Sequence, residues 1–364
     1  MIIKTLELRD FRNYKKEEVV FHEKINILAG SNAQGKTNLI EAVNLLALGK
    51  SFRTRREQEL VRFGTEEASV KGEFEKNGRR HTTEVRLCAG SSGKKSYFIN
   101  GLETGTVADL LGGVFTIVFS PEDLRIVKGD PETRRRVLDR SLIMLKPLYY
   151  FKLKNYKHVL KSRNALLKSE RVSMELLDIY DEKLAEAAAE VMEERADWLG
   201  RISEAAAVAG SGITRGEEEL SVEYRPNFAK SGDGFSKEAI RGYYLKGRER
   251  DVLMRATEMG PHKDDFSVFA SGLDLRVYGS QGQQRTAALS IKLAERELIK
   301  GETGEDAILL LDDVLSEFDA GRQERLMEGF GESQIFITTA GPFQEKAERL
   351  GTAKVIWVEE GRVR

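Results

Sequence analysis

Cysteine and histidine are scarce in this chain of 364 residues, which has one cysteine and four histidines. The single thiol, Cys88, cannot form a disulfide within the chain, and so few scattered ligands argue against a structural zinc site. The sequence also lacks any run of eighteen apolar residues, and its first nine residues do not form a signal-peptide core. These absences predict a protein of the reducing cytoplasm with no membrane partner.

A strong excess of charge of either sign is also absent, because the formal net charge is −1. The local distribution is uneven, however. Residues 131–171 carry 12 Lys and Arg against 3 Asp and Glu, whereas residues 172–219 carry 4 against 13. Both segments have helical patterns, so they are either two solvated helices that attract each other as an antiparallel pair, or a basic surface for an anionic partner beside an acidic helix.

What the chain does contain is a phosphate-binding loop. Its residues match G-x-x-x-x-G-K-[ST] at every required position: Gly30, Ser31, Asn32, Ala33, Gln34, Gly35, Lys36 and Thr37. An apolar strand is predicted before it at residues 24–29, and a helix after it at residues 38–48. Backbone N–H groups of such a loop face one anion, the lysine reaches the β- and γ-phosphates, and the threonine hydroxyl binds Mg²⁺. We therefore predict an ATP site with Lys36 catalytic and Thr37 a metal ligand; the alternative is a glycine-rich turn without a ligand.

A second part of this site is predicted where the apolar residues 307–311 end in two carboxylates, Asp312 and Asp313. A buried strand followed by carboxylates is typical of a Walker B motif. Asp312 is therefore predicted to bind Mg²⁺, and Asp313 to act as a general base toward the attacking water.

A third stretch, Ser280-Gln281-Gly282-Gln283, begins a long helix predicted over residues 283–300. Ser280 and Gly282 lie where a helix N-terminus presents backbone N–H groups, which favours an anion. The same residues could equally be an ordinary helix cap. Because the phosphate loop lies near residue 30 and the carboxylates near residue 312, the nucleotide domain is split by a long insertion.

This order of motifs resembles the ABC-type ATPase heads, in which the signature helix start of one subunit closes on the phosphate loop of another. Within that group the chain resembles the RecF family of bacterial DNA replication and recombination-repair ATPases, and the insertion is far too short for an SMC-type head. The motifs that carry the resemblance span the chain: Phe11-Arg12-Asn13-Tyr14, Gly49-Lys50-Ser51-Phe52-Arg53, Ser120-Pro121-Glu122-Asp123-Leu124, Lys128-Gly129-Asp130-Pro131, Gly260-Pro261-His262-Lys263-Asp264-Asp265 and Leu311-Asp312-Asp313.

The resemblance implies an α/β fold: an ABC-type ATPase head, with a mixed sheet core and an antiparallel β subdomain, and an inserted mainly α-helical arm (lobe II). We expect the discontinuous ATPase domain at residues 1–125 and 259–364, and the arm at residues 126–258. Strands are predicted at 2–8, 19–21, 68–74, 81–88, 95–99, 114–119, 220–224 and 334–338, with a hairpin at 265–269 and 273–278. Arm helices are predicted from residue 131, with a kink or a restart at Pro147, and at 174–209 and 237–256.

The resemblance also implies that ATP and Mg²⁺ drive homodimer formation on DNA and that DNA stimulates slow hydrolysis. Single- and double-stranded DNA, including gapped or junction DNA, are the expected nucleic acids, and RecO and RecR the expected protein partners in loading recombinase and supporting the SOS response. Arg12 and Asn13 are expected at the nucleotide, and Ser280 and Gly282 at the nucleotide of the second subunit. Candidate DNA contacts are Lys50, Arg53, Arg55 and Arg56, in a stretch that could also be an ordinary exposed loop, and Lys152, Lys154, Lys157, Lys161 and Arg163 in the arm.

Some positions depart from the ABC pattern. Asp313 stands where many of these heads have the longer glutamate, so slow hydrolysis is expected. No histidine follows the strand at 334–338, so Thr338 or Thr339 would have to sense the γ-phosphate. Two other functions stay open: an ATPase coupled to a non-DNA partner such as a transporter, and a dimerisation head that binds ATP without hydrolysing it.

Overall fold

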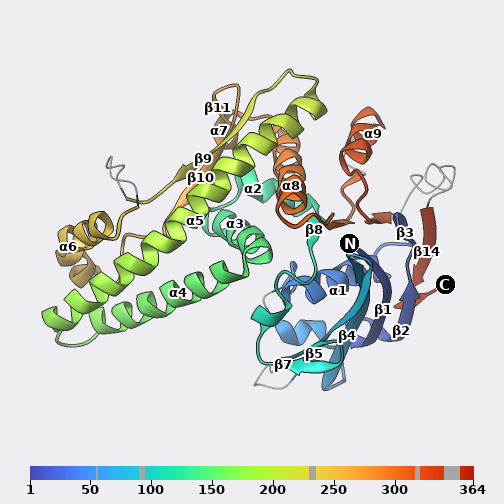
Figure 1. Cartoon of the computed structure of the whole chain (residues 1–364), viewed down its shortest axis with the longest axis horizontal. Helices are drawn as coiled ribbons and strands as arrows, with labels where there is room; N and C mark the ends of the chain where they lie inside the picture. Colours follow the sequence, from blue (N-terminus) through green and yellow to red (C-terminus); the bar gives the residue numbers. More distant parts are fainter. Residues whose placement is uncertain (55, 90–94, 229–234, 316–319, 340–352) are drawn as a thin grey trace. The chain divides into compact units, whose positions relative to one another are not determined.

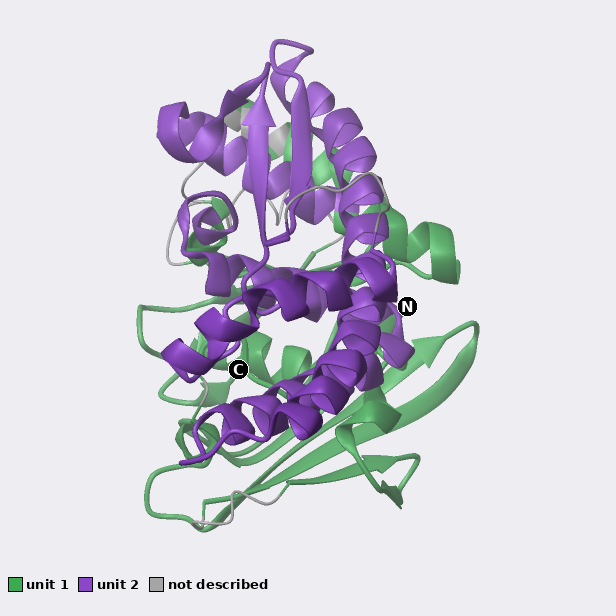
Figure 2. Ribbon diagram, turned by 90° about the vertical axis from the view of Figure 1, so that its left-hand side faces the viewer, with its two compact units in different colours: residues 1–123, 295–364 green, residues 124–294 purple. Residues whose placement is uncertain are grey.

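The computed structural model describes residues 1–54, 56–89, 95–228, 235–315, 320–339 and 353–364; Arg55 lies outside them. The chain divides into two compact units, residues 1–123 with 295–364 (unit 1) and residues 124–294 (unit 2), which Figure 2 shows in green and purple. The sequence placed the second domain boundary at residue 258, but residues 259–294 fall within unit 2. The reason is strand pairing, because β10 (Asp265–Ala270) pairs along its length with β9 (Leu220–Arg225) of the same unit.

Unit 1 contains a six-stranded sheet with the strand order β15-β14-β3-β13-β12-β8. Figure 1 labels its strands β14, β3 and β8. Its parallel strands are β14 (Ala353–Glu359), β3 (Ile25–Ala29), β13 (Ile335–Thr339), β12 (Ile308–Leu311) and β8 (Thr116–Phe119), and β15 (Arg362–Val363) closes a hairpin on β14. The central strands are almost entirely buried, as parallel strands covered on both faces require. Parallel β3 and β12 both end at one edge of this sheet, which brings the phosphate loop and the carboxylates together.

The second sheet of unit 1 is antiparallel, in the order β2-β1-β4-β5-β6-β7, and confirms the predicted β subdomain. Its strands are β1 (Ile2–Phe11), β2 (Tyr14–Val20), β4 (Glu67–Lys76), β5 (Arg79–Cys88), β6 (Lys95–Ile99) and β7 (Leu102–Thr104), of which β7 was not predicted. The helix α1 (Lys36–Leu48) packs against β4, β5 and β8 and is buried along nearly its whole length. Shorter helices of this unit are η1 (Glu57–Leu60), η2 (Val107–Leu110) and α9 (Ala320–Gly329).

Unit 2 is mainly helical, as predicted for the arm. Its helices are α2 (Arg125–Lys128), α3 (Pro131–Leu145), α4 (Pro147–Leu167), α5 (Met174–Thr214), α6 (Lys237–Met254) and α7 (Leu275–Tyr278), and α8 (Gln281–Thr303) begins in it. Pro147 starts a new helix, so of the predicted kink or restart the structure has the restart. The predicted strand at 273–278 is only two residues long, β11 (Leu273–Asp274), because α7 follows at once. No helix in the described ranges is long and apolar enough to cross a bilayer.

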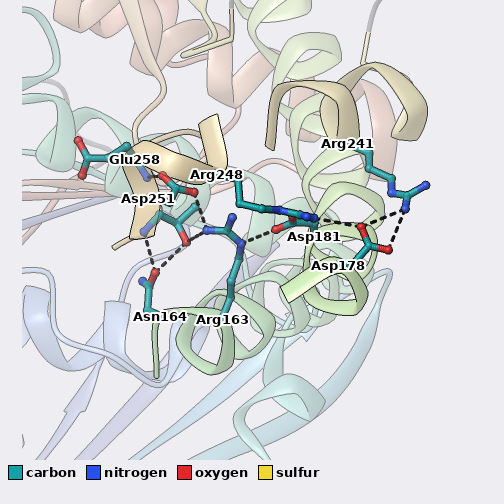
Figure 3. A network of polar contacts seen from close by, with 9 residues as sticks. Arg163, Asn164, Asp178, Asp181, Arg241, Arg248, Asp251 and Glu258 are labelled. Carbon is teal, nitrogen blue, oxygen red and sulfur yellow. Dashed lines mark hydrogen bonds and ion pairs between the residues drawn. The ribbon is translucent and has the colours of Figure 1, made fainter. Parts of the chain in front are cut away.

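The predicted antiparallel helix pair of opposite charge is present as α4 and α5. Near one end Lys152 Nζ lies 2.7 Å from Glu194 Oε1, and near the other Arg163 Nε lies 2.7 Å from Asp181 Oδ1. Figure 3 shows that Arg163 belongs to a polar network shared by α4, α5 and α6. The Arg163 side chain is fully buried, and its Nη1 also lies 2.7 Å from Asp251 Oδ2. The expectation that Arg163 contacts DNA is therefore wrong, because water and phosphate do not reach it.

The stretch from Gly260 to Asp265 packs into unit 2 through all its residues except the exposed Lys263. Asp265 accepts two hydrogen bonds of 2.6 Å from Arg134, and the buried Asp264 accepts one of 2.7 Å from the Asn227 N–H. His262 lies 2.6 Å from the Tyr156 hydroxyl through Nδ1 and 2.9 Å from a backbone carbonyl through Nε2. Burial lowers the pKa of His262 to about 4. These contacts give the stretch a role in stabilising unit 2.

Candidate nucleotide site

The phosphate loop and the carboxylate pair meet at one edge of the parallel sheet. Thr37 is the second residue of α1, and Asp312 directly follows β12. The Thr37 hydroxyl donates a hydrogen bond of 2.7 Å to Asp312 Oδ1, across 275 residues of sequence. The two predicted metal ligands are thus adjacent, as a Mg²⁺ site at a nucleotide requires.

Lys36 lies folded over its own loop. Its Nζ donates hydrogen bonds of 2.6 Å to the Gly30 carbonyl and 2.8 Å to the Ser31 carbonyl. Burial lowers the pKa of Lys36, while the nearby charges of Asp313 and Asp312 act in the opposite direction. A partly desolvated ammonium that donates to two neutral carbonyls is well placed to bind an incoming phosphate group.

The two carboxylates that follow β12 have different surroundings. Burial raises the pKa of Asp312, although hydrogen bonds from Thr37 and Thr338 oppose this effect. Asp313 is exposed, has a left-handed φ of 56°, and donates its N–H to Thr338 Oγ1 at 2.9 Å. A left-handed φ is uncommon outside glycine, although aspartate adopts it more readily than most residues. The structure therefore directs one carboxylate into the site and leaves the other accessible to solvent.

The donor set fits Mg²⁺. Magnesium takes hard oxygen ligands and commonly uses only one or two protein groups beside phosphates and water. The Thr37 hydroxyl and the Asp312 carboxylate supply that number, and a divalent cation would offset the burial of the carboxylate. Groups of three or more acidic, histidine or cysteine side chains suited to a metal do not occur in the described part of the chain.

The two glycines of the motif are needed because neighbouring segments approach the loop closely. Gly35 has a φ of 123°, and a Cβ there would lie 2.8 Å from Asn13 Nδ2 and 2.9 Å from the Tyr14 hydroxyl. That hydroxyl donates a hydrogen bond of 2.9 Å to the Gly35 carbonyl. Asn13 donates one of 2.8 Å to the Gln34 carbonyl. Asn13, which was expected at the nucleotide, therefore contacts the loop itself.

Sequence reasoning missed Glu41, a fully buried carboxylate on α1. Arg12 donates two hydrogen bonds of 2.8 Å to it, from Nε and Nη2, and the Ser51 hydroxyl donates a third. The sequence contained a signal for this residue, because Glu41 is an acidic residue within the apolar face of a predicted helix. Its consequence is that the Arg12 guanidinium, which was also expected at the nucleotide, is anchored beside the loop by α1.

The predicted DNA-contact residues differ in their surroundings. Arg53 Nη1 donates a hydrogen bond of 2.9 Å to Asn38 Oδ1 on α1. Burial raises the pKa of Asp312, and the positive charge of Arg53 is one of the effects that oppose this rise. Lys50 and Arg56 are exposed, the latter with 84% of its side-chain surface accessible. In the arm Lys154, Lys157 and Lys161 are exposed on α4, whereas Lys152 is paired with Glu194.

Ser280 precedes α8 and lies in unit 2. Its hydroxyl oxygen accepts a hydrogen bond of 3.2 Å from the Gln283 N–H, and its own N–H donates one of 2.9 Å to Gln283 Oε1. This reciprocal pair is a capping box, so the helix-cap alternative is present in the structure. Ser280 is nevertheless exposed, and an accepting hydroxyl keeps its own proton to donate.

The chain is similar to a family of DNA replication and repair proteins. The family model described as RecF/RecN/SMC N terminal domain matches residues 2–359. The DNA replication and repair protein RecF of Shouchella clausii (strain KSM-K16) is 42% identical and covers 100% of this chain and 99% of its own length. That of Bacillus cereus (strain G9842) is 40% identical, with 100% and 98% covered.

Solved structures agree with these sequences. A structure of the recombination mediator protein RecF with ATP in the RecFOR pathway has a TM-score of 0.90 at 34% identity, covering 100% of this chain and 96% of that chain. An SMC head bound to the C-winged helix domain of ScpA shares the fold, with a TM-score of 0.57 at 16% identity and 100% and 96% covered. These likenesses do not favour the transporter-coupled alternative. This chain belongs to the RecF family of DNA replication and repair proteins.

Proposed function

We propose that this protein is an ATP-dependent DNA-binding ATPase of recombinational gap repair and replication restart. The observation that carries the nucleotide part is the 2.7 Å contact between the Thr37 hydroxyl and Asp312. This contact joins the last residue of the phosphate loop to the carboxylate after β12. Solved structures similar to this chain include ones named for RecF with ATP or an ATP analogue.

The chain's own groups can perform slow phosphoryl transfer to water. Backbone N–H groups of the loop and of the first turn of α1 bind the phosphates, and Lys36 moves from its two carbonyl partners onto them. Asp313 accepts the proton of the attacking water or orients it. An aspartate reaches one methylene less far than a glutamate, so turnover is slow. Thr37 and Asp312 would hold Mg²⁺, which would supply charge neutralisation during phosphoryl transfer.

DNA binding is assigned to cations on two segments. One is the loop after α1, with the exposed Lys50, Arg53 and Arg56 and with Arg55, which lies outside the described residues. The other is α4, with the exposed Lys154, Lys157 and Lys161 and with Lys152, which is paired with Glu194. Lysine and arginine pairs with phosphate carry little sequence information, so gapped, junction, single- and double-stranded DNA are all acceptable ligands. Arg53 is also hydrogen-bonded to Asn38 in α1. DNA that binds Arg53 can therefore shift α1, which carries Lys36 and Thr37, and so stimulate hydrolysis.

ATP is proposed to join two copies of the chain. The exposed Ser280 hydroxyl and the N–H groups at the start of α8 bind the γ-phosphate held by the loop of a second copy, so ATP supports the dimer and ADP does not. RecO and RecR are the proposed protein partners in loading recombinase onto gaps, in agreement with relatives named for the RecFOR pathway.

The test mixes two variants that damage different halves of this composite site. Lys36→Met removes the cation of the loop, so we expect loss of ATP binding. Ser280→Arg places a bulky side chain at the start of α8, so we expect monomeric ATP binding without dimer or turnover. The mixture contains one site with both halves intact and should recover some dimer in gel filtration and some DNA-stimulated hydrolysis. Unchanged ATP affinity in Lys36→Met, or an inert mixture of two folded variants, would contradict the proposal.

A further inference from the structure

The turn Glu360–Gly361, which joins β14 to β15, lies against the phosphate loop. Strand β14 pairs in parallel with β3 up to Trp357 opposite Ala29, and so runs alongside the residues that lead into the loop. A Cβ on Gly30 would lie 2.2 Å from the Val358 carbonyl oxygen. The first glycine of the motif is therefore required by β14 as well as by the loop's own turn.

The turn binds one residue of the loop, Gln34, through two backbone N–H groups. The Gly361 N–H donates a hydrogen bond of 3.0 Å to the Gln34 carbonyl, and the Glu360 N–H donates one of 2.7 Å to Gln34 Oε1. Asn13 Nδ2 donates a third, of 2.8 Å, to the same carbonyl from the other side. Both oxygens of Gln34 are thus bonded to segments outside the loop.

These bonds fix the direction of the next N–H group. In a trans peptide unit the C=O and the N–H point in opposite directions. Holding the Gln34 carbonyl against the turn and Asn13 therefore directs the Gly35 N–H to the opposite side of the loop. A phosphate site built from backbone N–H groups depends on such prior orientation, because each group that must be ordered on binding reduces affinity.

The geometry of the turn is under greater constraint than that of comparable turns. Four described hairpin turns have two successive positive φ angles: Asn77–Gly78, Asn100–Gly101, Ser271–Gly272 and Glu360–Gly361. Asparagine and glycine suit such turns, whereas glutamate with a φ of 48° is unfavourable. A Cβ on Gly78, Gly101 or Gly272 would meet no heavy atom within 4 Å, but one on Gly361 would lie 2.3 Å from the Asn13 carbonyl oxygen.

We propose that the Glu360–Gly361 turn is a positioning element of the nucleotide site, which holds Gln34 so that the phosphate loop is in its anion-binding conformation before ATP arrives. This inference rests on the proposed binding of ATP by the loop. It assigns a role in that site to a turn more than 320 residues away in sequence, since the Glu360–Gln34 bond spans 326 residues.

Gly361→Ala tests the role, with Gly78→Ala as a matched control. The two glycines have φ angles of 71° and 69°, so alanine meets similar backbone strain at both, and any additional loss of melting temperature in Gly361→Ala reports the clash at that position. Only at position 361 does the new methyl group displace Asn13 or the turn. If the correctly oriented loop falls to about a tenth of the population, the Kd for ATP rises about tenfold. Isothermal titration with ATP should show this rise for Gly361→Ala and wild-type affinity for Gly78→Ala.

A second variant covers the case in which Gly361→Ala does not fold. Gln34→Ala removes the acceptor of the Glu360 N–H and leaves the hairpin intact, so ATP affinity should again fall while the melting temperature stays near that of the wild type. If each of these two variants that folds binds ATP with wild-type affinity, the positioning role is wrong and the proposed function is unaffected. Failure of the wild-type protein to bind ATP would instead overturn the proposed function, and this inference with it.

Discussion

Two cations on α4, Arg163 and Lys161, can be used to distinguish a residue that stabilises the fold from one that contacts DNA. Both were expected to contact DNA. Arg163 is fully buried and lies 2.7 Å from both Asp181 and Asp251 (Figure 3). Lys161, on the same helix, is exposed. Replacing each by methionine removes one positive charge from α4 with similar side-chain length. Arg163→Met should lose stability, whereas Lys161→Met should lose affinity for DNA.

The loss of unfolding free energy in Arg163→Met depends on the carboxylates that lose the Arg163 guanidinium. Asp181 keeps Arg248, whose Nη2 lies 2.6 Å from its Oδ2. Asp251 keeps the Glu258 N–H at 3.0 Å and loses its buried guanidinium. Removing one partner of a buried ion pair costs about 3 to 5 kcal/mol, and because one of the two carboxylates stays paired we expect about 3 kcal/mol. Lys161→Met should change the free energy of unfolding by about 0.5 kcal/mol or less.

Urea unfolding followed by tryptophan fluorescence measures this difference in unit 2. The chain has two tryptophans; Trp198 is buried in α5 of unit 2 and Trp357 lies on β14 of unit 1. A Trp357→Phe background therefore leaves one reporter, in the unit that contains Arg163. Adding Asp251→Asn to Arg163→Met removes the unpaired charge and should recover part of the lost stability.

DNA binding supplies the second measurement. Each phosphate contact that is lost should flatten the dependence of log affinity on log salt by about 0.9. In fluorescence anisotropy Lys161→Met should flatten this slope, and folded Arg163→Met should not. The reasoning is refuted if Arg163→Met flattens the slope and retains wild-type stability, since Arg163 would then be an accessible phosphate contact.

Two further predictions concern chemistry and pH. Asp313→Asn keeps the size of the side chain and removes its charge, so ATP should still bind while hydrolysis falls by about 10²- to 10⁴-fold and dimers accumulate; normal turnover in a phosphate-release assay would show that Asp313 is not the base. Burial lowers the pKa of His262 from 6.5 to about 4, so the unfolded chain takes up its proton first as pH falls. The His262 contribution to stability is thus complete above about pH 6.5 and is lost toward pH 4, by about 1.3 kcal/mol between pH 7.5 and 5.5. Urea unfolding at both pH values should show that loss in the wild type and its absence in His262→Gln; equal pH dependence in both proteins would contradict it.

Much of the nucleotide site could be predicted from the sequence because its chemistry depends on short motifs. The eight residues of the phosphate loop fix a backbone shape by themselves, and an apolar strand that ends in Asp312 and Asp313 has few other uses. Hairpin turns at Asn77 and Asn100 were predicted for the same reason, since asparagine and glycine tolerate left-handed conformations. Local propensity and local chemistry were sufficient at these positions.

Tertiary structure decided which charges are exposed and which segments support the loop. Arg163 and Lys161 have the same charge and nearly the same sequence neighbourhood, and only the packing of α5 and α6 against α4 distinguishes the buried cation from the exposed one. The unpredicted β14–β15 hairpin gives a further example, since Glu360 is a poor residue for a left-handed turn and its N–H reaches Gln34 across 326 residues. Backbone N–H groups are identical in every residue except proline, so no sequence pattern reports where they donate. The sequence determined by itself the groups that bind phosphate, and long-range pairing of β14 with β3 decided what holds those groups in place.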